Sequence, residues 1–408
     1  MKCRHCGTEL TLPFLDLGSA PPSNSYLTSA ALHAPEKWYP LRVMVCTECW
    51  LVQTEDFADF EELFSADYAY FSSFSDSWLR HARGYVEAMV ERFALGTAAH
   101  VVEVAANDGY LLQYMRERGI PCLGVEPTAS TAAAARAKGI EVVESFFGRR
   151  LATELLAEGK AADLMAANNV LAHVPDINDF VGGFTILLKE NGVATFEFPH
   201  LLRLVEGVQF DTVYHEHFSY LSLSAVARVF ERNGLRVCDV EELPTHGGSL
   251  RVFAQRADTG AQPVAASVGA MLARERAAGM TAAPYYQDFQ PRAEKIKDDL
   301  MEFLIDAKRS GKTVAAYGAA AKGNTLLNFA GIRPDLVSFV VDRNPAKQGK
   351  YMPGSRIPIV AESALQEYRP DHVLVLPWNL APELDDQLSY VRQWGGRLVS
   401  AVPRLTQW

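Results

Sequence analysis

The sequence predicts an α/β protein in which a doubly wound parallel sheet is the largest part. Two pairs of cysteines stand near the N-terminus, short apolar strands alternate with helical segments through the middle, and a second, shorter alternation follows near the C-terminus. A length of 408 residues is enough for two or three domains. The expected parts are a small lobe over 1–60, a sheet domain over 61–256, a helical linking segment over 257–310 and a smaller α/β unit over 311–408.

Composition and charge narrow the class of protein. Hydrophobic residues make up 49% of the chain and charged residues 22%, which is typical of a globular protein. No apolar run is long enough to cross a bilayer, and the start, MKCRHCGTEL, is not a signal peptide, so we expect a cytosolic protein without a membrane partner. The net charge of −10 argues against a nucleic-acid partner, because phosphate binding needs clustered Lys and Arg.

Four of the six cysteines form two C-x-x-C knuckles, made by Cys3 and Cys6 and by Cys46 and Cys49. Paired knuckles in a cytosolic chain predict a tetrahedral zinc site, and four thiolates leave no open position, so the zinc is expected to be structural. It would hold a lobe that has few apolar residues for a core of its own. The alternative is two unrelated redox or free cysteine pairs.

Residues 61–95 have a helical pattern that contains an insert of alternating aromatic residues and serines, DYAYFSSFS at 67–75. One interpretation is a loop that packs its rings on the next domain. The other is a lid that brings hydroxyl groups to a cleft. The residues alone favour the loop.

Strands and helices alternate from residue 99 to residue 200. Five apolar strands are expected within 99–115, 120–128, 139–146, 162–174 and 192–200. Such alternation is typical of a parallel sheet that is covered on both faces and binds ligands at the carboxyl ends of its strands. Two further strands, at 234–243 and 248–256, are joined by PTHGG and are therefore expected to be antiparallel. A doubly wound sheet closed by such a hairpin resembles the class I methyltransferases.

The turn after the first strand and the acid after the second form the candidate cofactor site. A nucleotide-like cofactor needs a close backbone approach at the first position and a carboxylate for its ribose at the second. EVAANDG fills the first position, although Ala105 and Asn107 replace two glycines of the usual E-x-G-x-G-x-G, and GVEPT supplies the acid. The alternative is a dinucleotide fold with an altered loop. For S-adenosylmethionine, the candidate contacts are Glu103, Asn107, Gly109, Glu126 and Asn168.

The C-terminal unit begins with a strand, a turn of small residues and a helix within KTVAAYGAAAKGNTLLNFAG (312–331). GAAAKGNT is not a Walker A loop, because the spacing and the G-K-[ST] ending are absent. Its amide groups and lysine could still meet a diphosphate at a helix N-terminus, which makes Lys322, Asn324 and Thr325 candidate substrate contacts. The alternative is that Lys322 is an ordinary surface residue.

Together, the cysteine lobe, the methyltransferase-like sheet, YGAAAKGNT and VVDRNPAKQGKYMPGS resemble the sugar C-methyltransferases of deoxysugar biosynthesis over essentially the whole chain. The resemblance is closest to the C-3′-methyltransferases that act on dTDP-linked 4-keto deoxysugars, such as the 3-amino sugar that leads to tetronitrose. It implies that S-adenosylmethionine donates the methyl group and that the C-terminal unit helps to hold the nucleotide sugar. It also implies that YHEHFSY and DYAYFSS line the active site, which reverses the interpretation of 67–75 as a packing loop.

The segment YHEHFSY, at 214–220, carries the candidate catalytic residues. Its two histidines are two positions apart, so in an extended segment they would share a face. Methylation of carbon requires removal of a proton beside a ketone and stabilisation of the enolate, and histidine titrates near working pH. The expected roles are base for His217, orientation of a neighbour or of the sugar's amino group for Glu216, enolate donation or placement of the ring for Tyr214 and Tyr68, and support for His173. A metal is not expected here, because the H-E-x-x-H spacing is absent.

Three other functions stay open at this stage. A small-molecule O- or N-methyltransferase would share the fold and the cofactor without needing an enolising base. A sugar-nucleotide-binding protein without activity would explain the altered glycine loop. A zinc-ribbon protein that modifies nucleic acid is opposed by the acidic charge.

Overall fold

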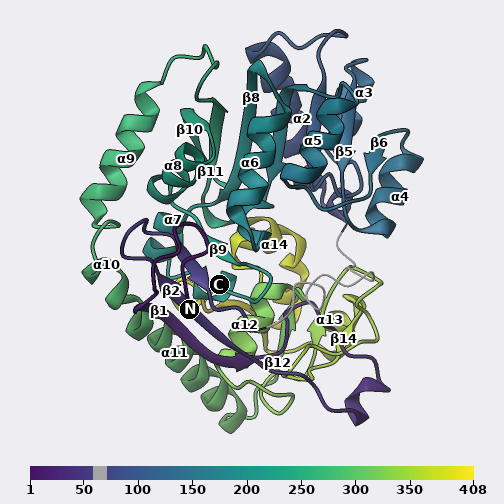
Figure 1. The fold of residues 1–408 in the computed structure, drawn as a ribbon. Helices are drawn as coiled ribbons and strands as arrows, with labels where there is room; N and C mark the ends of the chain where they lie inside the picture. Colours follow the sequence, from purple (N-terminus) through teal and green to yellow (C-terminus); the bar gives the residue numbers. More distant parts are fainter. Residues whose placement is uncertain (58–70) are drawn as a thin grey trace.

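The structure is a computed structural model that describes residues 1–57 and 71–408. Within these ranges, each helix is too short or too polar to cross a membrane. Tyr68 and the first part of the predicted insert, 67–70, lie outside the described residues. The methyltransferase-like sheet occupies the upper half of Figure 1, and the N-terminal lobe and the C-terminal unit lie together in the lower half.

The N-terminal lobe is built on a four-stranded antiparallel sheet in the order β1-β2-β3-β9. Its strands are β1 (Leu12–Ala20), β2 (Tyr39–Val45), β3 (Val52–Thr54) and β9 (Ser219–Tyr220). The last strand comes from the YHEHFSY segment, and Val52 pairs with Tyr220. The candidate catalytic segment is therefore part of the sheet of the zinc lobe.

The central sheet has seven strands in the order β10-β11-β8-β7-β4-β5-β6. Its strands are β4 (Val101–Val104), β5 (Cys122–Val125), β6 (Glu141–Val143), β7 (Ala162–Asn168), β8 (Leu188–Pro199), β10 (Leu235–Leu243) and β11 (Ser249–Arg256). The predicted hairpin is present: β11 is antiparallel to β10 and is inserted between it and β8. The chain order reverses beside β4, so the ends of β4 and β7 form the switch point at which such sheets bind ligands.

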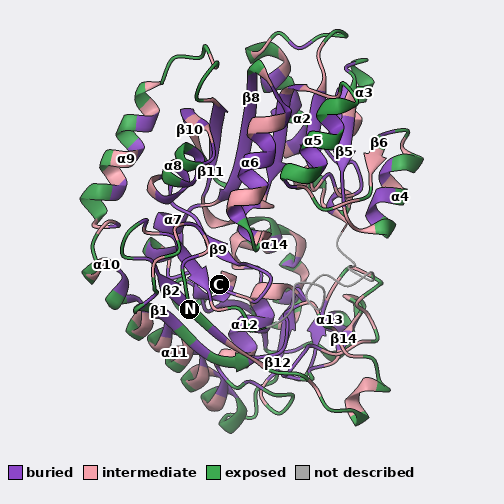
Figure 2. Cartoon of the chain, in the orientation of Figure 1, coloured by how far each residue is buried: buried purple, intermediate pink, exposed green. Residues whose placement is uncertain are grey.

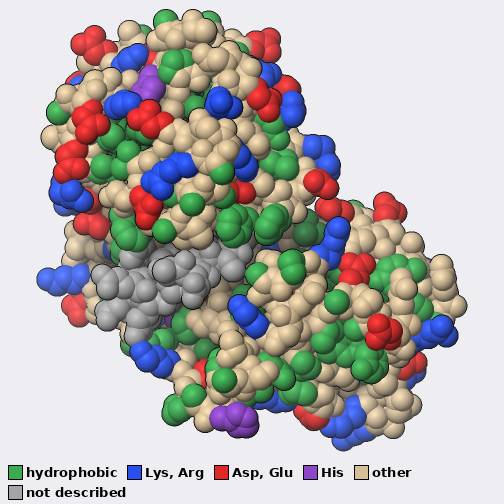
Figure 3. All heavy atoms as spheres, turned by 90° about the vertical axis from the view of Figure 1, so that its right-hand side faces the viewer, with side chains coloured by type: hydrophobic (Ala, Val, Ile, Leu, Met, Phe, Trp, Pro, Cys, Tyr) green, Lys and Arg blue, Asp and Glu red, His purple; other side chains and the backbone are tan. Residues whose placement is uncertain are grey.

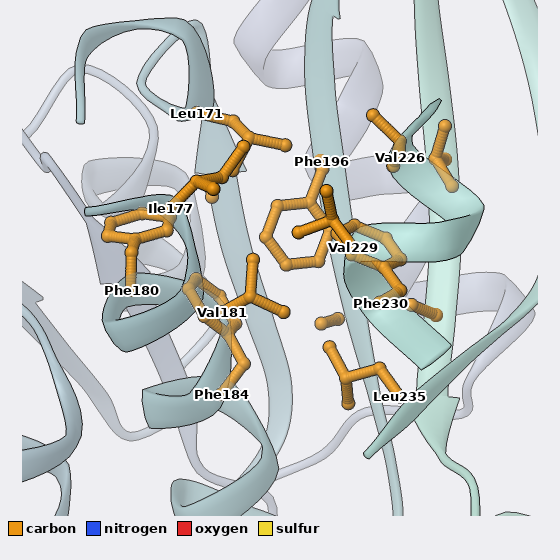
Figure 4. Packing of buried hydrophobic residues seen from close by; sticks show 14 of the residues in the cluster. Leu171, Ile177, Phe180, Val181, Phe184, Phe196, Val226, Val229, Phe230 and Leu235 are labelled. Atoms are coloured by element: carbon orange, nitrogen blue, oxygen red, sulfur yellow. The ribbon is translucent and has the colours of Figure 1, made fainter. Parts of the chain in front are cut away.

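Helices cover both faces of this sheet. They are α2 (Asp76–Arg92), α3 (Leu112–Glu117), α4 (Ala129–Ala137), α5 (Arg149–Ala157), α6 (Ile177–Leu187) and α8 (Leu223–Arg232). The short helix α7 (Leu201–Glu206) instead packs in the core that contains β1 and β2. Figure 4 shows one side of the core, where rings of α6 and α8 meet Phe196 of β8. The centroids of Phe184 and Phe230 both lie 4.6 Å from that of Phe196. The rigid sheet that results positions the loops at its strand ends.

The linking segment forms α9 (Ala266–Ala278), α10 (Pro284–Gln287) and α11 (Phe289–Arg309). Ile296, Leu300 and Leu304 are buried on one face of α11, as their helical spacing predicts. The N-terminal end of α11 packs on β1, where the rings of Phe14 and Phe289 stack at 4.6 Å. Figure 2 shows the resulting burial, with α11 exposed only on its outer side. The zinc lobe therefore obtains its core from later parts of the chain.

The C-terminal unit contains a six-stranded sheet in the order β14-β13-β12-β15-β16-β17, parallel except for β17. Its strands are β12 (Val314–Tyr317), β13 (Val340–Val341), β14 (Ile359–Val360), β15 (His372–Val375), β16 (Arg397–Ser400) and β17 (Thr406–Gln407), and its helices are α12 (Ala321–Phe329), α13 (Ser363–Tyr368) and α14 (Ala381–Gln387). This is the second, smaller α/β unit that the sequence predicts.

Short 3₁₀ turns connect these elements, and four of them carry polar side chains of the candidate site. The turns are η1 (Ala31–His33), η2 (Ser72–Phe74), η3 (Leu171–His173), η4 (Phe210–Thr212), η5 (Thr245–Gly247), η6 (Trp378–Leu380) and η7 (Ser389–Trp394). In the side view of Figure 3 the upper and lower halves of the molecule are seen one above the other. The turns η3, η4 and η5 follow strands of the methyltransferase-like domain, and η6 belongs to the C-terminal unit.

Candidate active site and zinc centre

The four knuckle cysteines converge in the N-terminal lobe. Their sulfur atoms all lie within 4.8 Å of one another, and the Sγ–Sγ distances are 3.5 Å for Cys3–Cys49 and 3.5 Å for Cys6–Cys46. Zn–S bonds of about 2.3 Å in a tetrahedron place sulfurs about 3.8 Å apart, so the four thiols fit a zinc ion. The hydrogen bond between Cys3 and Cys49 lowers the pKa of Cys3 and raises that of Cys49, so the pair shares one proton. Within 1–57 and 71–408, these residues form the only such cluster.

The two knuckles have the same backbone construction. Gly7 donates its amide hydrogen to the carbonyl of Cys3 at 2.9 Å, and Trp50 donates to that of Cys46 at 3.0 Å. Both donors have positive φ, 80° for Gly7 and 62° for Trp50. The backbone of each knuckle therefore turns back directly after its second cysteine. Trp50 tolerates this because its ring stacks on Tyr286 of α10, with centroids 6.1 Å apart.

The turn after β4 has the backbone of a glycine-rich cofactor loop without its glycines. Ala105, Asn107 and Gly109 have φ values of 59°, 50° and 76°, the left-handed region that favours glycine. These are the three positions at which E-x-G-x-G-x-G has glycine. At Gly109 the requirement is steric as well, because an added Cβ would lie 2.3 Å from Cδ1 of Ile140.

Glu126 anchors this turn. Its Oε2 accepts the amide hydrogen of Asn107 at 2.9 Å, and its Oε1 accepts that of Thr128 at 2.9 Å. Each carboxylate oxygen has a second lone pair, so the same group is suited to accept from the vicinal hydroxyls of a ribose. The acid at the end of β5 thus lies where the sequence pattern places it, beside the loop.

Buried polar atoms without partners indicate that this end of the sheet fits a polar cofactor. Among the described residues, both carboxylate oxygens of Glu103, Oδ1 of Asp108 and Oδ1 of Asn168 are buried and have no hydrogen-bond partner. Burial raises the pKa of Glu103 well above its usual range. Leaving such groups unsatisfied is costly, and the amino and hydroxyl groups of S-adenosylmethionine are donors that would satisfy them.

The end of the predicted 67–75 insert lies on the cofactor turn. Ser72 donates its amide hydrogen to Oδ1 of Asn107 at 2.9 Å, and Ser73 donates to Oδ2 of Asp108 at 3.3 Å. Lys138 donates to the hydroxyl of Ser73 at 2.8 Å and to the carbonyl of Asp108 at 2.6 Å. The chain that leaves the insert is therefore tied to the loop beside the cofactor, whereas Tyr68 is outside the described residues.

His217 and His173 lie together, and His173 is in the turn η3 that follows the carboxyl end of β7. Their ring centroids are 4.5 Å apart. His217 Nδ1 lies 3.1 Å from the carbonyl oxygen of Thr212, and His173 Nδ1 lies 2.8 Å from that of Glu216. A carbonyl only accepts, so each Nδ1 carries a hydrogen, and in the neutral ring Nε2 is then the basic nitrogen.

Burial keeps both imidazoles neutral. It lowers the pKa of His173 to about 4 and that of His217 well below its usual range, where the positive field of Lys322 also contributes. The ring of Tyr214 covers His217 at a centroid distance of 4.0 Å. A neutral imidazole with a fixed tautomer is the form that can accept a proton from carbon.

The side chains of His215 and Glu216 do not face the same partners as that of His217. His217 donates its amide hydrogen to the carbonyl of Tyr214 at 3.0 Å, so the segment turns and the expectation that His215 and His217 share a face is wrong. His215 Nε2 contacts the carbonyls of Tyr39 and Pro40 at 3.3 and 3.2 Å and holds the edge of β2. His215 and His217 therefore have different hydrogen-bond partners.

Glu216 is bound to the N-terminal lobe. Its Oε1 accepts from the backbone amide and the side-chain amide of Asn24, at 3.3 and 3.0 Å. Its Oε2 is buried and has no partner within the described chain. Burial raises the pKa of this carboxyl. One oxygen is therefore fixed, while the other has no hydrogen-bond partner within the described residues.

The predicted residues of α12 have different surroundings. Lys322 donates to Oδ1 of Asn379 at 2.6 Å, and its Nζ lies 4.7 Å from the ring centroid of Trp378. Asn324 donates to the carbonyl of Ser23 at 2.5 Å, and the hydroxyl of Thr325 donates to that of Val213 at 2.8 Å. The last two side chains thus join α12 to the other parts of the chain, and their contact with substrate stays a prediction.

Sequence reasoning did not identify three polar residues of this region. Asp211 accepts a hydrogen bond from Nε1 of Trp378 at 2.7 Å. Nε2 of His246 lies 3.4 Å from Nδ2 of Asn169. His246 and Asn169 both have positive φ, 53° and 54°. Two strained residues that face each other are a feature of functional sites. For His246 the sequence signal is PTHGG, a pattern that by itself indicates only a hairpin connection.

The strand order, with antiparallel β11 between β8 and β10, and the acid-anchored turn after β4 define the chain as a class I S-adenosylmethionine-dependent methyltransferase. The domain models for "Methyltransferase domain", "C-methyltransferase C-terminal domain" and "Putative zinc binding domain" match residues 78–240, 244–403 and 3–64. The chain is 36% identical over 402 residues to C-methyltransferase NovU of Streptomyces niveus, covering 98% of this chain and 95% of that protein. It belongs to this family of C-methyltransferases.

Solved methyltransferase structures resemble part of the chain. The magnesium protoporphyrin IX methyltransferase of Synechocystis, solved with bound S-adenosylmethionine, has 14% identity and a TM-score of 0.34, covering 44% of this chain and 79% of its own. The 1,6-didemethyltoxoflavin-N1-methyltransferase of Burkholderia thailandensis has 16% identity and a TM-score of 0.37, covering 51% and 96%.

The protein is therefore an S-adenosylmethionine-dependent C-methyltransferase with a structural zinc site. The sulfonium of S-adenosylmethionine supplies an electrophilic methyl group. Glu103, Asn107, Gly109, Glu126 and Asn168 are the residues proposed to hold it. The geometry of the four cysteines fits the predicted zinc site. The predicted enzyme class is confirmed.

Proposed function

We propose that the protein methylates C-3′ of a dTDP-linked 4-keto deoxysugar that carries an amino group at the same carbon, and that His217 removes the proton from this carbon. The observation that carries the proposal is the pair of neutral imidazoles, His173 and His217, whose Nδ1 atoms are both occupied by carbonyls. A C-methyltransferase needs an electron-rich carbon, and a ketone beside a base provides one. The sugar class comes from the resemblance to sugar C-methyltransferases and from the C-methyltransferase relative.

The residues around His217 have complementary roles in this proposal. The carbonyl of Thr212 holds the imidazole so that Nε2 faces the substrate carbon. Tyr214, whose ring covers His217, places the sugar ring or donates to the enolate oxygen, and Tyr68 shares this role. His173 supports the edge of His217 and holds the backbone of Glu216.

Glu216 provides the argument for an amino substituent. Its Oε2 is buried without a partner among the described residues, while Oε1 is held by Asn24. An unpaired buried carboxylate oxygen is costly, and an ammonium group on the substrate would satisfy it with a charge-assisted hydrogen bond. A hydroxyl group at the same carbon would gain less. The proposal therefore predicts a preference for the 3-amino over the 3-hydroxy sugar.

Exchange of the carbon-bound proton with solvent deuterium distinguishes this function from O- or N-methylation. Without the methyl donor, the wild-type protein should exchange the proton at C-3′ of a dTDP-4-keto-3-amino sugar, as measured by NMR. The His217→Asn variant should lose this exchange, while His33→Asn, at an exposed position far along the chain, serves as the matched control. If His217→Asn exchanges and methylates at the wild-type rate, another residue is the base, and His173 and His215 are the next to test.

A further inference from the structure

One short turn orients both the proposed base and a charged residue of the C-terminal unit. In η4, the carbonyl of Thr212 accepts from Nδ1 of His217 at 3.1 Å. The preceding residue, Asp211, is fully buried and accepts from Nε1 of Trp378 at 2.7 Å. Adjacent residues of the same turn therefore hold the imidazole on one side and the indole on the other.

Lys322 is held against this indole. Its Nζ lies 4.7 Å from the ring centroid of Trp378 and donates to Oδ1 of Asn379 at 2.6 Å. Lys322 and Thr325 are three residues apart on α12 and so lie on one face of the helix. Thr325 donates to the carbonyl of Val213, directly after η4, at 2.8 Å. The face of α12 that carries Lys322 is therefore fastened to the turn that orients His217.

The ammonium of Lys322 also acts on the site through its charge. Its positive field contributes to the lowered pKa of His217 and of His246, and it opposes the raised pKa of Asp211. These effects require the four groups to share one poorly solvated region. Among residues 1–57 and 71–408, Asn379 accepts one ammonium hydrogen, which leaves two for a substrate acceptor. A cation with donors to spare beside a base is suited to a substrate oxygen that gains negative charge.

We propose that Lys322 is a catalytic residue that donates a hydrogen bond from its ammonium group to the ketone oxygen of the substrate while His217 takes the adjacent proton, with Asp211 and Trp378 as positioning residues. The C–H bond breaks, and its proton goes to Nε2 of His217. Its electron pair forms the carbon–carbon double bond of the enolate, and the carbonyl π pair moves to the oxygen beside the ammonium. When the methyl group is transferred, the pair on oxygen re-forms the carbonyl, the pair of the carbon–carbon double bond forms the new bond to the methyl carbon, and the methyl–sulfur bond breaks with its pair left on sulfur. This inference rests on the proposed function.

The competing role for Lys322 is binding of the substrate diphosphate. The two roles make different predictions, because a diphosphate contact acts on affinity for dTDP alone, whereas a ketone contact acts on enolisation at saturating sugar. Lys322→Met removes the charge and the donors at similar length. Lys322→Gln keeps a donor near Asn379 without the charge and serves if the methionine variant does not fold. Lys312→Met, at an exposed position, is the matched control.

The deciding experiment measures deuterium exchange at C-3′, kcat, and dTDP affinity by calorimetry for each zinc-loaded, full-length variant. Lys322→Met and Lys322→Gln should lower the exchange rate and kcat by about 10²–10³-fold, the usual effect of removing an oxyanion donor, with dTDP affinity within about threefold of wild type. Exchange at the wild-type rate would overturn the proposal and leave the tyrosines as the donors. A loss of dTDP affinity as large as the loss of exchange would overturn it in favour of the diphosphate.

Asp211 has its own test. Asp211→Asn should lower kcat and exchange with unchanged KM, and the double variant with Lys322→Met should be no slower than Lys322→Met alone, because both changes act on the same donor. Additive losses would show that Asp211 does not act through Lys322. If the wild-type protein exchanges no proton, the proposed function itself fails. If wild type exchanges and His217→Asn does not, that function stands, and the lysine variants alone decide this inference.

Discussion

The hydroxyl of Thr54 donates a hydrogen bond of 2.5 Å to the carbonyl oxygen of His217. Thr54 is the last residue of β3, and the preceding Gln53 donates to Sγ of Cys3 at 3.3 Å. The predicted zinc site and the proposed base are thus connected through two hydrogen bonds made by adjacent residues of β3. The zinc lobe therefore holds the segment that is proposed to be catalytic.

The first prediction concerns removal of zinc. Cys46→Ser should abolish zinc binding and lower kcat by about 10²-fold, the effect of a misplacement of about 1 Å at the base. The affinity for S-adenosylmethionine, whose proposed site is in the central sheet, should change by less than about threefold. Metal analysis, steady-state kinetics and calorimetry measure the three quantities. Cys122→Ser, at a cysteine outside the cluster, is the control, and full zinc content in Cys46→Ser would contradict the assignment.

The second prediction concerns Glu126. Glu126→Ala should weaken binding of S-adenosylmethionine by about 1–3 kcal/mol, because it removes the acceptor for the ribose and releases the amide of Asn107. Glu126→Gln keeps one acceptor oxygen and should lose less. Calorimetry with both variants gives the comparison. Unchanged affinity in Glu126→Ala would place the cofactor elsewhere.

The third prediction uses the backbone strain of the cofactor turn. Ala105 has a φ of 59°, which costs an alanine about 1 kcal/mol relative to glycine. Ala105→Gly should therefore leave the free energy of unfolding unchanged or raise it by up to about 1 kcal/mol, measured by urea denaturation. Ala132→Gly, inside α4, should lower it by about 1 kcal/mol instead. A clear loss of stability in Ala105→Gly would contradict the left-handed conformation.

The fourth prediction concerns pH. Burial lowers the folded-state pKa of His173 to about 4, below the unfolded value of about 6.5. The unfolded state then binds more protons between these values, so stability is full above the unfolded pKa and is lost as pH falls towards 4. The titration of His173 should lower the free energy of unfolding by about 2 kcal/mol between about pH 7.5 and about pH 5. Urea denaturation of wild type and His173→Gln at both pH values isolates the contribution.

The lowered pKa of a buried histidine should also affect the pH dependence of catalysis. The pKa of His217 is also lowered by burial, so the free enzyme should keep a neutral base well below the usual histidine range. The acidic limb of kcat/KM should therefore lie below about pH 6.5, since this parameter reports the free enzyme. A limb centred above that value would mean that a different group is the base.

Several features could be predicted from the sequence because they depend on local patterns. The C-x-x-C spacing brings Cys3 and Cys6 together within one turn. Cys46 and Cys49 form a second turn of the same kind, and the four-cysteine site forms when the two turns meet. The alternation of apolar strands with helices determines a parallel sheet, and the acid after the second strand follows from that sheet. The spacing of Ile296, Leu300 and Leu304 determines the buried face of α11.

Contacts between distant parts of the chain decided the rest. No local pattern shows that Ser219–Tyr220 completes the sheet of residues 12–54, because the pairing depends on how the zinc lobe packs against the methyltransferase domain. The opposite directions of His215 and His217 follow from a turn that this packing imposes. The positions of Lys322 and Asp211 beside the base depend on the docking of α12 on η4. Sequence periodicity specifies which face of an element is buried, whereas the side chains that meet in the cleft are specified only when several buried faces are satisfied at once.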